Sequence, residues 1–404
     1  MPATVPAAFP FIEVKIDTSA LTPVAQRSPG VIAIVGKTEA GAAGGTATAN
    51  KPFAIDTLDQ AAGLFAQKNA DGTVTETPLY GALKIAILQD PKPSKIYGVK
   101  VDGNNYAGAL SALEAADDVT FVSLANEFDV GAPASPGNPA AVPPVPSTIA
   151  TNLNALRDHV ESMSAQGQKR IGVAMVNPTT AKSNTYVDTV TAAVASLKSS
   201  SSRMVVIAAR GSTGDAATAA MSAIAGFDPQ VSVVLKKVRG FAMPVESQYS
   251  PSEIKGLSEA GIIPIIDPAL IVGESLHFAE GRCFTTDASL LYVDIVRVLD
   301  DIDFRLKAGL IGAVGDARIT KSGMTMLKTR VEGILGPLQR SGVIVNFNIE
   351  LPVLNILSLP ESTWTATDLA IVQTARANRM VDLFVTVTYG PAVHRLKVTL
   401  SPKF

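Results

Sequence analysis

Short, continuous runs of apolar residues recur along the first two thirds of the chain, and segments of helical character separate them. One such run is Met204–Ala209, which contains no polar residue. A strand covered on both faces needs a continuous apolar run, whereas a strand with one solvated face alternates. Strands of this kind that alternate with helices are typical of a parallel sheet with helices on both faces. We therefore expect an α/β fold with a doubly wound sheet.

Apolar runs and helical periodicity give the expected order of elements in this part of the chain. The expected strands are residues 31–36, 95–101, 119–124, 170–176, 204–209, 231–235 and 262–266. The expected helices are residues 57–66, 78–88, 106–116, 148–165, 184–197, 215–225 and 252–260. Six prolines within residues 131–147 exclude regular structure there and predict an exposed loop or linker.

The last third of the chain, residues 281–404, predicts a different order of elements. A helix is expected over Thr285–Leu306 with a stop at Gly309, and a second helix over Lys321–Gln339, which Pro337 should kink or end early. The elements expected after it are a strand over 343–349, a helix over 365–379, and strands over 381–389 and 393–400 on either side of a Gly390-Pro391 turn. This part of the chain is therefore expected to form an α+β domain.

The first twenty residues are expected to form an arm. Three prolines in the first ten residues disfavour a helix, and the following segment alternates, with Ile12, Val14 and Ile16 on one face. Two interpretations remain open. The segment is either an edge strand of the chain's own sheet or a strand donated to a neighbouring subunit, because unpaired strand edges recruit foreign strands.

The serial order over the last 150 residues resembles the C-terminal domain of contractile tail sheath proteins, which occur in phages, pyocin-like particles and related injection systems. The similarity rests on Glu-Ile-Lys-Gly at 253–256, Gly-Ile-Ile-Pro-Ile-Ile at 261–266, Gly-Arg-Cys-Phe-Thr-Thr at 281–286, and Ser-Gly-Val-Ile-Val-Asn-Phe-Asn at 341–348. The resemblance implies an N-terminal strand arm over 1–20, an outer α/β domain over 21–270 and a C-terminal sheath domain over 271–404.

The resemblance also implies a function. It predicts a structural subunit, not an enzyme, that polymerises helically around a rigid inner tube and drives it through a target envelope on contraction, without nucleotide hydrolysis. The expected partners are other copies of the chain, the tube protein, and baseplate and tail terminator proteins. We expect assembly in the host cytoplasm, and then a virion tail or a released contractile particle.

The resemblance assigns roles to particular residues. The strands implied to be exchanged between subunits carry, besides Ile12, Val14 and Ile16, the residues Val381, Leu383, Val385, Val387, Leu396, Val398 and Leu400. The helix over 365–379 is implied to touch the tube through Asp368, Arg376 and Arg379. Another interpretation of the two arginines is that they only complement the negative end of the helix dipole.

Composition argues against several other classes of protein. Charged residues make up 17% of the chain and the net charge is −2, which does not support nucleic acid or an anionic membrane surface as a partner. The chain has one cysteine, and its three histidines lie far apart, so no disulfide, metal site or cofactor is expected. No apolar stretch reaches the roughly 18 residues of a membrane span, and no signal peptide is seen.

The strand ends are the places where α/β sheets usually bind ligands, so they offer the candidates for a catalytic or ligand-binding site. Asn177 and Arg210 each follow an expected strand, and Arg210 precedes a helix start where a phosphate or carboxylate could bind. A capped turn explains the same residues. A two-domain enzyme using these turns is the alternative function. Gly36-Lys37-Thr38 lacks the spacing of a phosphate-binding loop.

The cysteine and the histidines offer little material for a nucleophilic site. His159 is expected at a solvated helix position, His277 in a loop near Cys283, and His394 in the last strand. A pair of Cys283 and His277 stays open, although the resemblance makes the cysteine structural.

Overall fold

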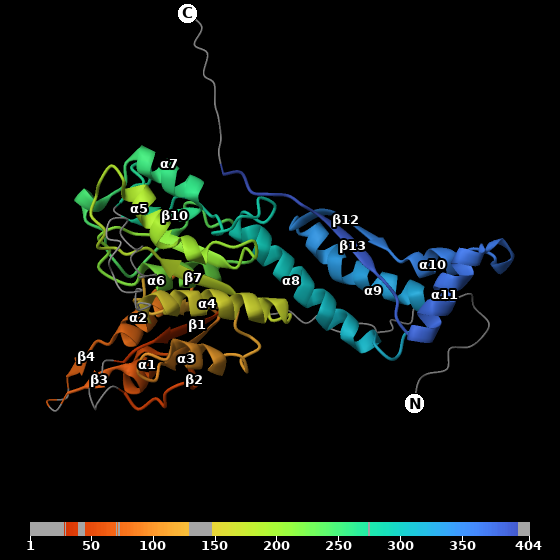
Figure 1. Ribbon diagram of the computed structural model, residues 1–404, viewed down its shortest axis with the longest axis horizontal. Helices are drawn as coiled ribbons and strands as arrows, with labels where there is room; N and C mark the ends of the chain where they lie inside the picture. The colour runs from red at the N-terminus through yellow and green to blue at the C-terminus, as the bar shows by residue number, and fades with distance from the viewer. Residues whose placement is uncertain are drawn as a thin grey trace, which may run out of the picture. The chain divides into compact units, whose positions relative to one another are not determined.

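The computed structural model describes residues 28, 30–38, 45–69, 71, 73–128, 148–273 and 275–394. Among these residues the chain forms two compact units. The larger holds the described residues up to Phe304 together with 335–350 and 384–394, and the smaller holds 305–334 and 351–383 (Figure 1). Each unit is described separately below. The expected boundaries at residues 20 and 270 concern the roles of the parts in an assembly, and they remain a prediction.

A nine-stranded sheet forms the centre of the larger unit, in the order β2-β5-β1-β6-β7-β8-β10-β11-β9. The six parallel strands are β1 (Val31–Gly36), β5 (Lys95–Lys100), β6 (Phe121–Leu124), β7 (Ile171–Met175), β8 (Met204–Ala208) and β10 (Ile262–Ile266). Antiparallel strands flank them: β2 (Pro52–Ile55) on one side, and β11 (Leu276–Phe278) and β9 (Lys237–Val238) on the other. The central strands are buried along their whole length, as continuous apolar runs predict.

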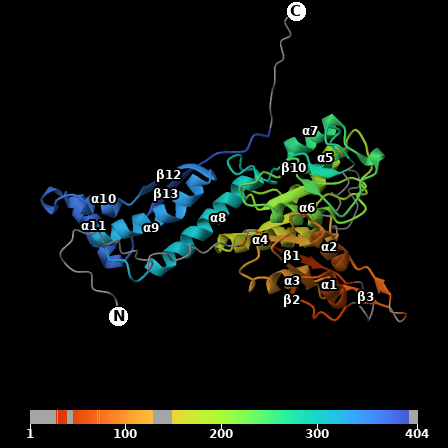
Figure 2. The same ribbon diagram turned by 180° about the vertical axis from the view of Figure 1, so that it is seen from behind.

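Helices pack on this sheet in groups. Its helices are α1 (Leu58–Phe65), α2 (Pro78–Ile87), α3 (Tyr106–Ala112), α4 (Thr148–Ala165), α5 (Tyr186–Ala193), α6 (Ala216–Gly226) and α7 (Pro251–Ala260). Helix α2 packs with α1 and α6, α3 packs with α4, and α5 packs with α7 (Figure 2). Helix α6 is alanine-rich and fully buried from Ala216 to Ala225, so it approaches the strands closely. A Cβ atom on Gly30 would lie 2.3 Å from the Ala225 carbonyl oxygen, which explains glycine at that position. The α/β class predicted from the sequence is confirmed.

The last third supplies the remaining main elements. They are α8 (Val293–Leu310), α9 (Lys321–Arg340), β12 (Ile344–Glu350), α10 (Pro352–Leu357), α11 (Ala366–Asn378) and β13 (Phe384–Tyr389). Strands β12 and β13 form an antiparallel two-stranded sheet in the larger unit, whereas α10 and α11 lie in the smaller one. Minor elements are a hairpin of β3 (Gln67–Lys68) and β4 (Val74–Thr75), and short 3-10 turns at Ala195–Leu197, Val245–Ser247, Ile311–Ala313 and Glu361–Thr363.

Several sequence-based boundaries are wrong. Helix α8 begins at Val293 rather than Thr285, because Thr285 is used in tertiary hydrogen bonds with Ser199 and Ser202. It also runs past Gly309 to Leu310. Helix α9 continues through Pro337 to Arg340, so the proline does not end it early.

Two expected strands also differ. Residues 231–235 form turns, since Leu235 adopts a left-handed conformation (φ 58°), and β9 follows at Lys237 instead. Strand β13 begins at Phe384 and pairs with β12, so Val381 and Leu383 precede the strand. Residues 391–394 are not in a strand, and 395–400 lie outside the described residues. The expected loop at 131–147 also lies outside them.

Candidate functional site

The turns after β7 and β8 lie next to each other, as expected for neighbouring parallel strands. The Gly211 backbone N–H donates to the Pro178 carbonyl at 2.7 Å, which joins the two turns. Asn177 and Arg210 each follow a strand, as expected, and the structure shows that the two turns are adjacent. Asn177 is used within its own turn, where its side-chain oxygen accepts from the Thr179 N–H at 2.9 Å.

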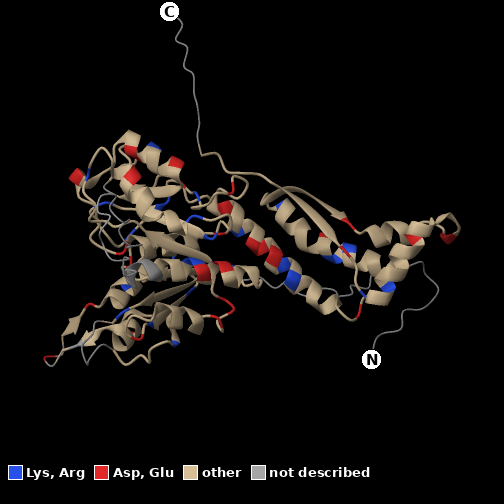
Figure 3. Ribbon diagram, in the orientation of Figure 1, with Lys and Arg blue, Asp and Glu red and all other residues tan. Residues whose placement is uncertain are grey.

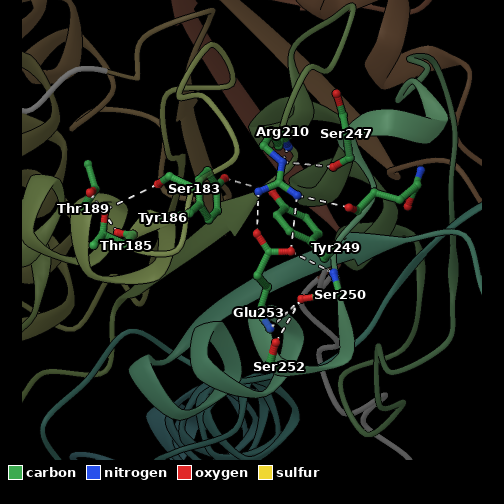
Figure 4. Close-up of polar contacts among 11 residues, drawn as sticks. Ser183, Thr185, Tyr186, Thr189, Arg210, Ser247, Tyr249, Ser250, Ser252 and Glu253 are labelled. Carbon is green, nitrogen blue, oxygen red and sulfur yellow. Dashed lines mark hydrogen bonds and ion pairs between the residues drawn. The ribbon is translucent and has the colours of Figure 1, made fainter.

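The Arg210 side chain is surrounded by two aromatic rings, a carboxylate and two backbone carbonyls (Figure 4). Its guanidinium lies between the rings of Tyr186 and Tyr249, at 4.5 and 4.7 Å from their centroids. It pairs with the Glu253 carboxylate at 2.7 Å. It also donates to the backbone carbonyls of Ser247 (3.1 Å) and Gln248 (3.0 Å). Only 3% of Arg210 is exposed.

Glu253 joins this cluster to the start of α7. It is the acidic residue of a capping box: its carboxylate accepts from the Ser250 N–H at 2.8 Å, and its own N–H donates to the Ser250 hydroxyl. The hydrogen bond from Arg210 is the largest influence that lowers the pKa of Glu253, to about 2, with the Ser250 bonds in support. Burial is the main cause of the raised pKa values of Tyr186 and Tyr249.

The contacts of this cluster hold the turn after β8 against the start of α7, which is a structural role. A phosphate or carboxylate ligand would have to displace Glu253 and two backbone carbonyls to reach the guanidinium. The capped-turn interpretation is thus favoured over a ligand site at Arg210. The sequence did not reveal that Tyr186, Tyr249 and Glu253 meet Arg210, although Ser250 followed by Glu253 three residues later is a readable capping signal.

The cysteine and the buried histidines do not form a reactive pair in this structure. Cys283 is fully buried, and burial raises the pKa of its thiol to about 12, so it is a neutral thiol at neutral pH. His277 lies in β11, not in a loop, and its Nδ1 contacts the Ser275 carbonyl at 2.9 Å. His159 is only 8% exposed, so the prediction of a solvated position is wrong. Its Nε2 lies 2.8 Å from Nη1 of the buried Arg170 side chain, within hydrogen-bond distance.

Gly36 is a packing glycine at the end of β1. A Cβ atom there would lie 2.6 Å from the Ala125 Cβ and 3.2 Å from the Leu79 Cβ. Lys37 lies 3.8 Å from the Glu127 carboxylate, and its carbonyl accepts the Leu79 N–H. The residues that follow β1 are thus engaged in contacts that join it to neighbouring elements.

The β12–β13 sheet is a candidate assembly surface. Val385 opposes Ile349 and Val387 opposes Phe347, so these four side chains share one face. The other face carries the exposed residues Asn346, Asn348, Thr386 and Thr388. Among the described residues no further strand pairs with β12 or β13, so each has one open edge. Neither strand contains proline, lysine or arginine, the residues that often protect an edge.

Helix α11 is the other candidate surface, within the smaller unit. Only Val372 and Ala375 of this helix are buried, and the apolar side chains Leu369 (46% exposed) and Ile371 (40%) face solvent. Arg376 is exposed in its last turn, and Arg379 is its exposed C-cap residue with a left-handed conformation (φ 53°).

The third residue assigned to the tube, Asp368, has a structural task. Its carboxylate accepts from the Thr365 N–H (3.0 Å) and the Thr365 hydroxyl (2.7 Å), which closes a capping box at the start of α11. The backbone hydrogen bond is the main cause of its lowered pKa. Asp368 therefore lies at the opposite end of the helix from the two arginines.

The remaining site residues named from the sequence lie outside the described part. They are Ile12, Val14, Ile16, Leu396, Val398 and Leu400.

In the part that is described, no three His, Cys, Asp or Glu side chains are placed to hold a metal ion. Nor does any described helix combine the length and apolar character that crossing a bilayer requires. Lysines and arginines occur alongside acidic residues on α8, so this helix carries no field of one sign (Figure 3).

Comparison with known proteins gives matches among solved structures. No protein-family model matches the sequence, and no curated protein matches it. A chain of the anti-feeding prophage baseplate is 13% identical, covers 98% of this chain and 99% of its own, and has a TM-score of 0.63. A chain of the contracted PVC sheath complex, an extracellular contractile injection system, is 10% identical over 98% of both chains, with a TM-score of 0.68. The sheath tail protein of Listeria innocua is 12% identical over 90% and 96%, with a TM-score of 0.52. At such identities these matches establish a shared fold over nearly the whole chain.

Proposed function

We propose, from the premise that this chain has the fold of contractile tail sheath proteins, that it is a structural subunit of a contractile sheath. In this proposal the subunits polymerise helically around a rigid inner tube and drive it through a target envelope on contraction. The similarity supports a structural role because it spans 98% of the chain and includes chains from a baseplate and from a contracted helical sheath. It also supports association with other copies and with a baseplate.

The open edges of the β12–β13 sheet are the observation that carries the proposal. A two-stranded sheet is marginal by itself, and its free backbone groups are satisfied when a further strand is added. The exposed side chains of Asn346, Asn348, Thr386 and Thr388 are uncharged, and Glu350 at the end of β12 is the one charged residue of the two strands. Strand addition from neighbouring subunits would therefore complete this sheet.

The chain's own termini are the proposed source of the added strands. Residues 11–17 alternate with Ile12, Val14 and Ile16 on one face, and 396–400 alternate with Leu396, Val398 and Leu400. In the subunit itself, Val385 and Val387 face Ile349 and Phe347 inside the sheet. Val381 and Leu383 precede β13 and would extend it when a partner strand arrives. The arms would keep the sheath continuous while its subunits rotate.

Helix α11 is the proposed contact with the tube. Its exposed side chains Leu369 and Ile371, with Arg376 and Arg379 near its end, offer apolar area and positive charge to a partner. Asp368 belongs to the proposed surface, although its carboxylate also caps the helix. We further propose that contraction uses no nucleotide: the extended assembly is trapped above a contracted state that buries more surface.

The cellular setting follows from this role. The subunit would assemble in the host cytoplasm with the tube, baseplate and terminator proteins, and act in a virion tail or a released particle. The outer α/β domain, residues 21–270, would face away from the tube. The N-terminal arm and residues 271–404 would join the lattice.

Electron microscopy of the purified full-length chain tests the proposal, beside a truncated chain that starts at Ser19. Hollow, regularly striated cylinders from the full chain, lost on truncation, are the expected result. Both samples are also co-expressed with the tube protein, because a sheath that needs its tube as a template forms only then. Discrete particles of a few subunits in every sample would refute sheath assembly.

The alternative function, an enzyme that binds a phosphate or carboxylate near Asn177 and Arg210, makes the opposite prediction. Such an enzyme would stay a small oligomer and gain thermal stability from inorganic phosphate. The closed environment of Arg210 favours the structural role.

A further inference from the structure

The chain is fastened at both ends of the short segment that follows β13. At the first end, the Tyr389 hydroxyl donates to the Asp294 carboxylate at 2.8 Å. Asp294 is itself buried at the start of α8, so the acceptor is fixed. At the second end, His394 contacts the side chains of Ser232, Glu280 and Tyr292, which are far away in the sequence. The intervening Val393 is 81% exposed, so the segment is not held by burial of its own apolar side chains.

His394 makes three separate contacts. Its Nε2 lies 2.9 Å from the Ser232 hydroxyl. Its ring meets the Tyr292 ring edge to face, with centroids 4.9 Å apart and planes at 82°. Its Nδ1 lies 3.9 Å from the Glu280 carboxylate. Three independent groups thus specify both the position and the orientation of one imidazole.

The groups that receive His394 are themselves held in place. Glu280 has 7% of its side chain exposed and accepts from the Gly281 N–H at 3.2 Å. Arg282 lies 3.5 Å from Glu280, 5.8 Å from the Tyr292 ring centroid, and donates to the Ser258 carbonyl at 3.1 Å. The receiving site, which we define as Ser232, Glu280 and Tyr292, therefore includes groups that make contacts of their own besides those with His394.

A cavity of about 230 Å³ adjoins this site, lined in part by Pro391 and Ala392 of the segment. Because Arg282 and Asp294 both line the cavity, charges of both signs are present and no ion is favoured. Residues of the segment itself thus form part of the cavity wall.

We propose that His394 is a positioning residue, which holds residues 390–394 on its own subunit and so sets the point from which residues 395–404 leave toward a second copy of this chain. The proposal rests on the sheath function above and names a residue that governs it. Ordering a flexible segment costs conformational entropy at the moment of binding. If residues 390–394 are ordered beforehand, docking of the arm in a neighbouring subunit orders fewer residues and is tighter.

Trypsin cleavage of the unassembled subunit tests the anchor directly. Arg395 follows His394 in the sequence, and a protease that cleaves after it also binds the residues just before it, so residues 392–394 must leave the subunit surface. Ser232→Ala removes one contact of His394 without changing the cleaved sequence, and His394→Ala removes all three. We expect cleavage after Arg395 to be about tenfold faster in His394→Ala and to rise by a smaller factor in Ser232→Ala, in proportion to the population of the released segment.

The controls separate release of the segment from general unfolding. Val393→Ala trims an exposed neighbour and should leave the rate unchanged. His394→Gln, which keeps a group able to bond Ser232, should restore part of the protection. Cleavage after the fully buried Arg170 reports unfolding of the unit and should stay slow in every variant. Equal cleavage after Arg395 in the intact chain, Ser232→Ala and His394→Ala would overturn the anchor.

Assembly provides the second readout. We expect the subunit concentration required for polymerisation to rise about tenfold in His394→Ala, less in Ser232→Ala, and not in Val393→Ala. If the variants are cleaved faster yet polymerise like the intact chain, the positioning role is wrong while the sheath function stands. If the intact chain does not polymerise even with its tube, the sheath function fails, and the positioning role fails with it, whereas the cleavage rates still decide whether His394 fastens the segment.

Discussion

Arg210 follows a strand end, where many α/β proteins bind anions, yet its positive charge is paired with a carboxylate of the same chain. The guanidinium is stacked between two phenol rings and paired with Glu253, which also caps α7. The pair connects the end of β8 with the start of α7 across about forty residues of sequence. Its expected role is therefore to hold those elements together.

Replacing Arg210 with alanine should destabilise the subunit by about 3 kcal/mol, because the substitution leaves a mostly buried carboxylate without its partner. Arg210→Lys should recover little, since a lysine cannot make the planar paired contact or stack on both rings. Urea unfolding measures the loss. Arg239→Ala is the matched control: it breaks an exposed pair with Asp90 and should cost less than about 1 kcal/mol. Equal losses for both substitutions would contradict the assigned role.

His159 makes the subunit sensitive to mild acid. Burial, reinforced by the charge of Arg170, lowers the pKa of His159 from 6.5 to about 4. Between these values the unfolded chain binds a proton that the folded chain does not, so the stability is complete above pH 6.5 and falls as the pH drops toward 4. The loss is at most about 3 kcal/mol.

Urea unfolding at pH 7 and pH 5 checks this prediction. His159→Gln keeps an acceptor for Arg170 but cannot be protonated, so it should remove most of the histidine's share of the difference between the two pH values. An unchanged pH dependence in His159→Gln would show that other groups cause it. The lowered pKa of Glu253 acts in a separate range, because its contribution is lost only as the pH falls from about 4.5 toward 2.

Among the elements, those set by local pattern were predictable from the sequence. Strand β10 and helix α4 have the expected limits, and β8 differs by one residue. Continuous apolar runs and long helical periodicity are properties of the local sequence, so the limits of these elements agree with the sequence pattern.

Elements whose limits depend on tertiary contacts were not predictable. The polar residues at 285–287 looked like a helix cap, but Thr285 bonds to the chain near Ser199, and α8 starts later. Within the described residues β13 pairs with β12, from which it is separated by more than thirty residues of sequence. The Arg210 cluster joins side chains from α5, from the turn after β8 and from the start of α7 and the residues before it, which no spacing rule relates.

Helix α11 allows a test that separates tube binding from helix stability. Arg379 is held in a left-handed conformation at the helix C-cap, where glycine is favoured by about 1 kcal/mol. Arg379→Gly should therefore raise the stability of the smaller unit slightly while weakening assembly on the tube. Trp364, the only tryptophan of the chain, precedes α11 and reports unfolding by fluorescence.

Arg376→Ala completes the comparison. It should lower stability by a few tenths of a kcal/mol through the helix dipole and also weaken tube assembly. Co-sedimentation of the subunit with preformed tubes measures binding. If both variants bind tubes as well as the intact chain does, the proposed tube surface is wrong, and Arg376 serves only the helix.

At the scale of the whole molecule, the low charge content fits a protein that buries much of its surface against other copies. With 17% charged residues and a net charge of −2, repulsion between subunits is weak. A lattice that gains contacts on contraction can then release free energy without a chemical fuel. Assembled particles treated with apyrase and EDTA should contract on mild urea treatment as fast as untreated particles. Arg210→Ala subunits should form sheaths that lose order at a lower urea concentration. Contraction that stops without nucleotide or magnesium would show that the energy comes from hydrolysis rather than from the lattice.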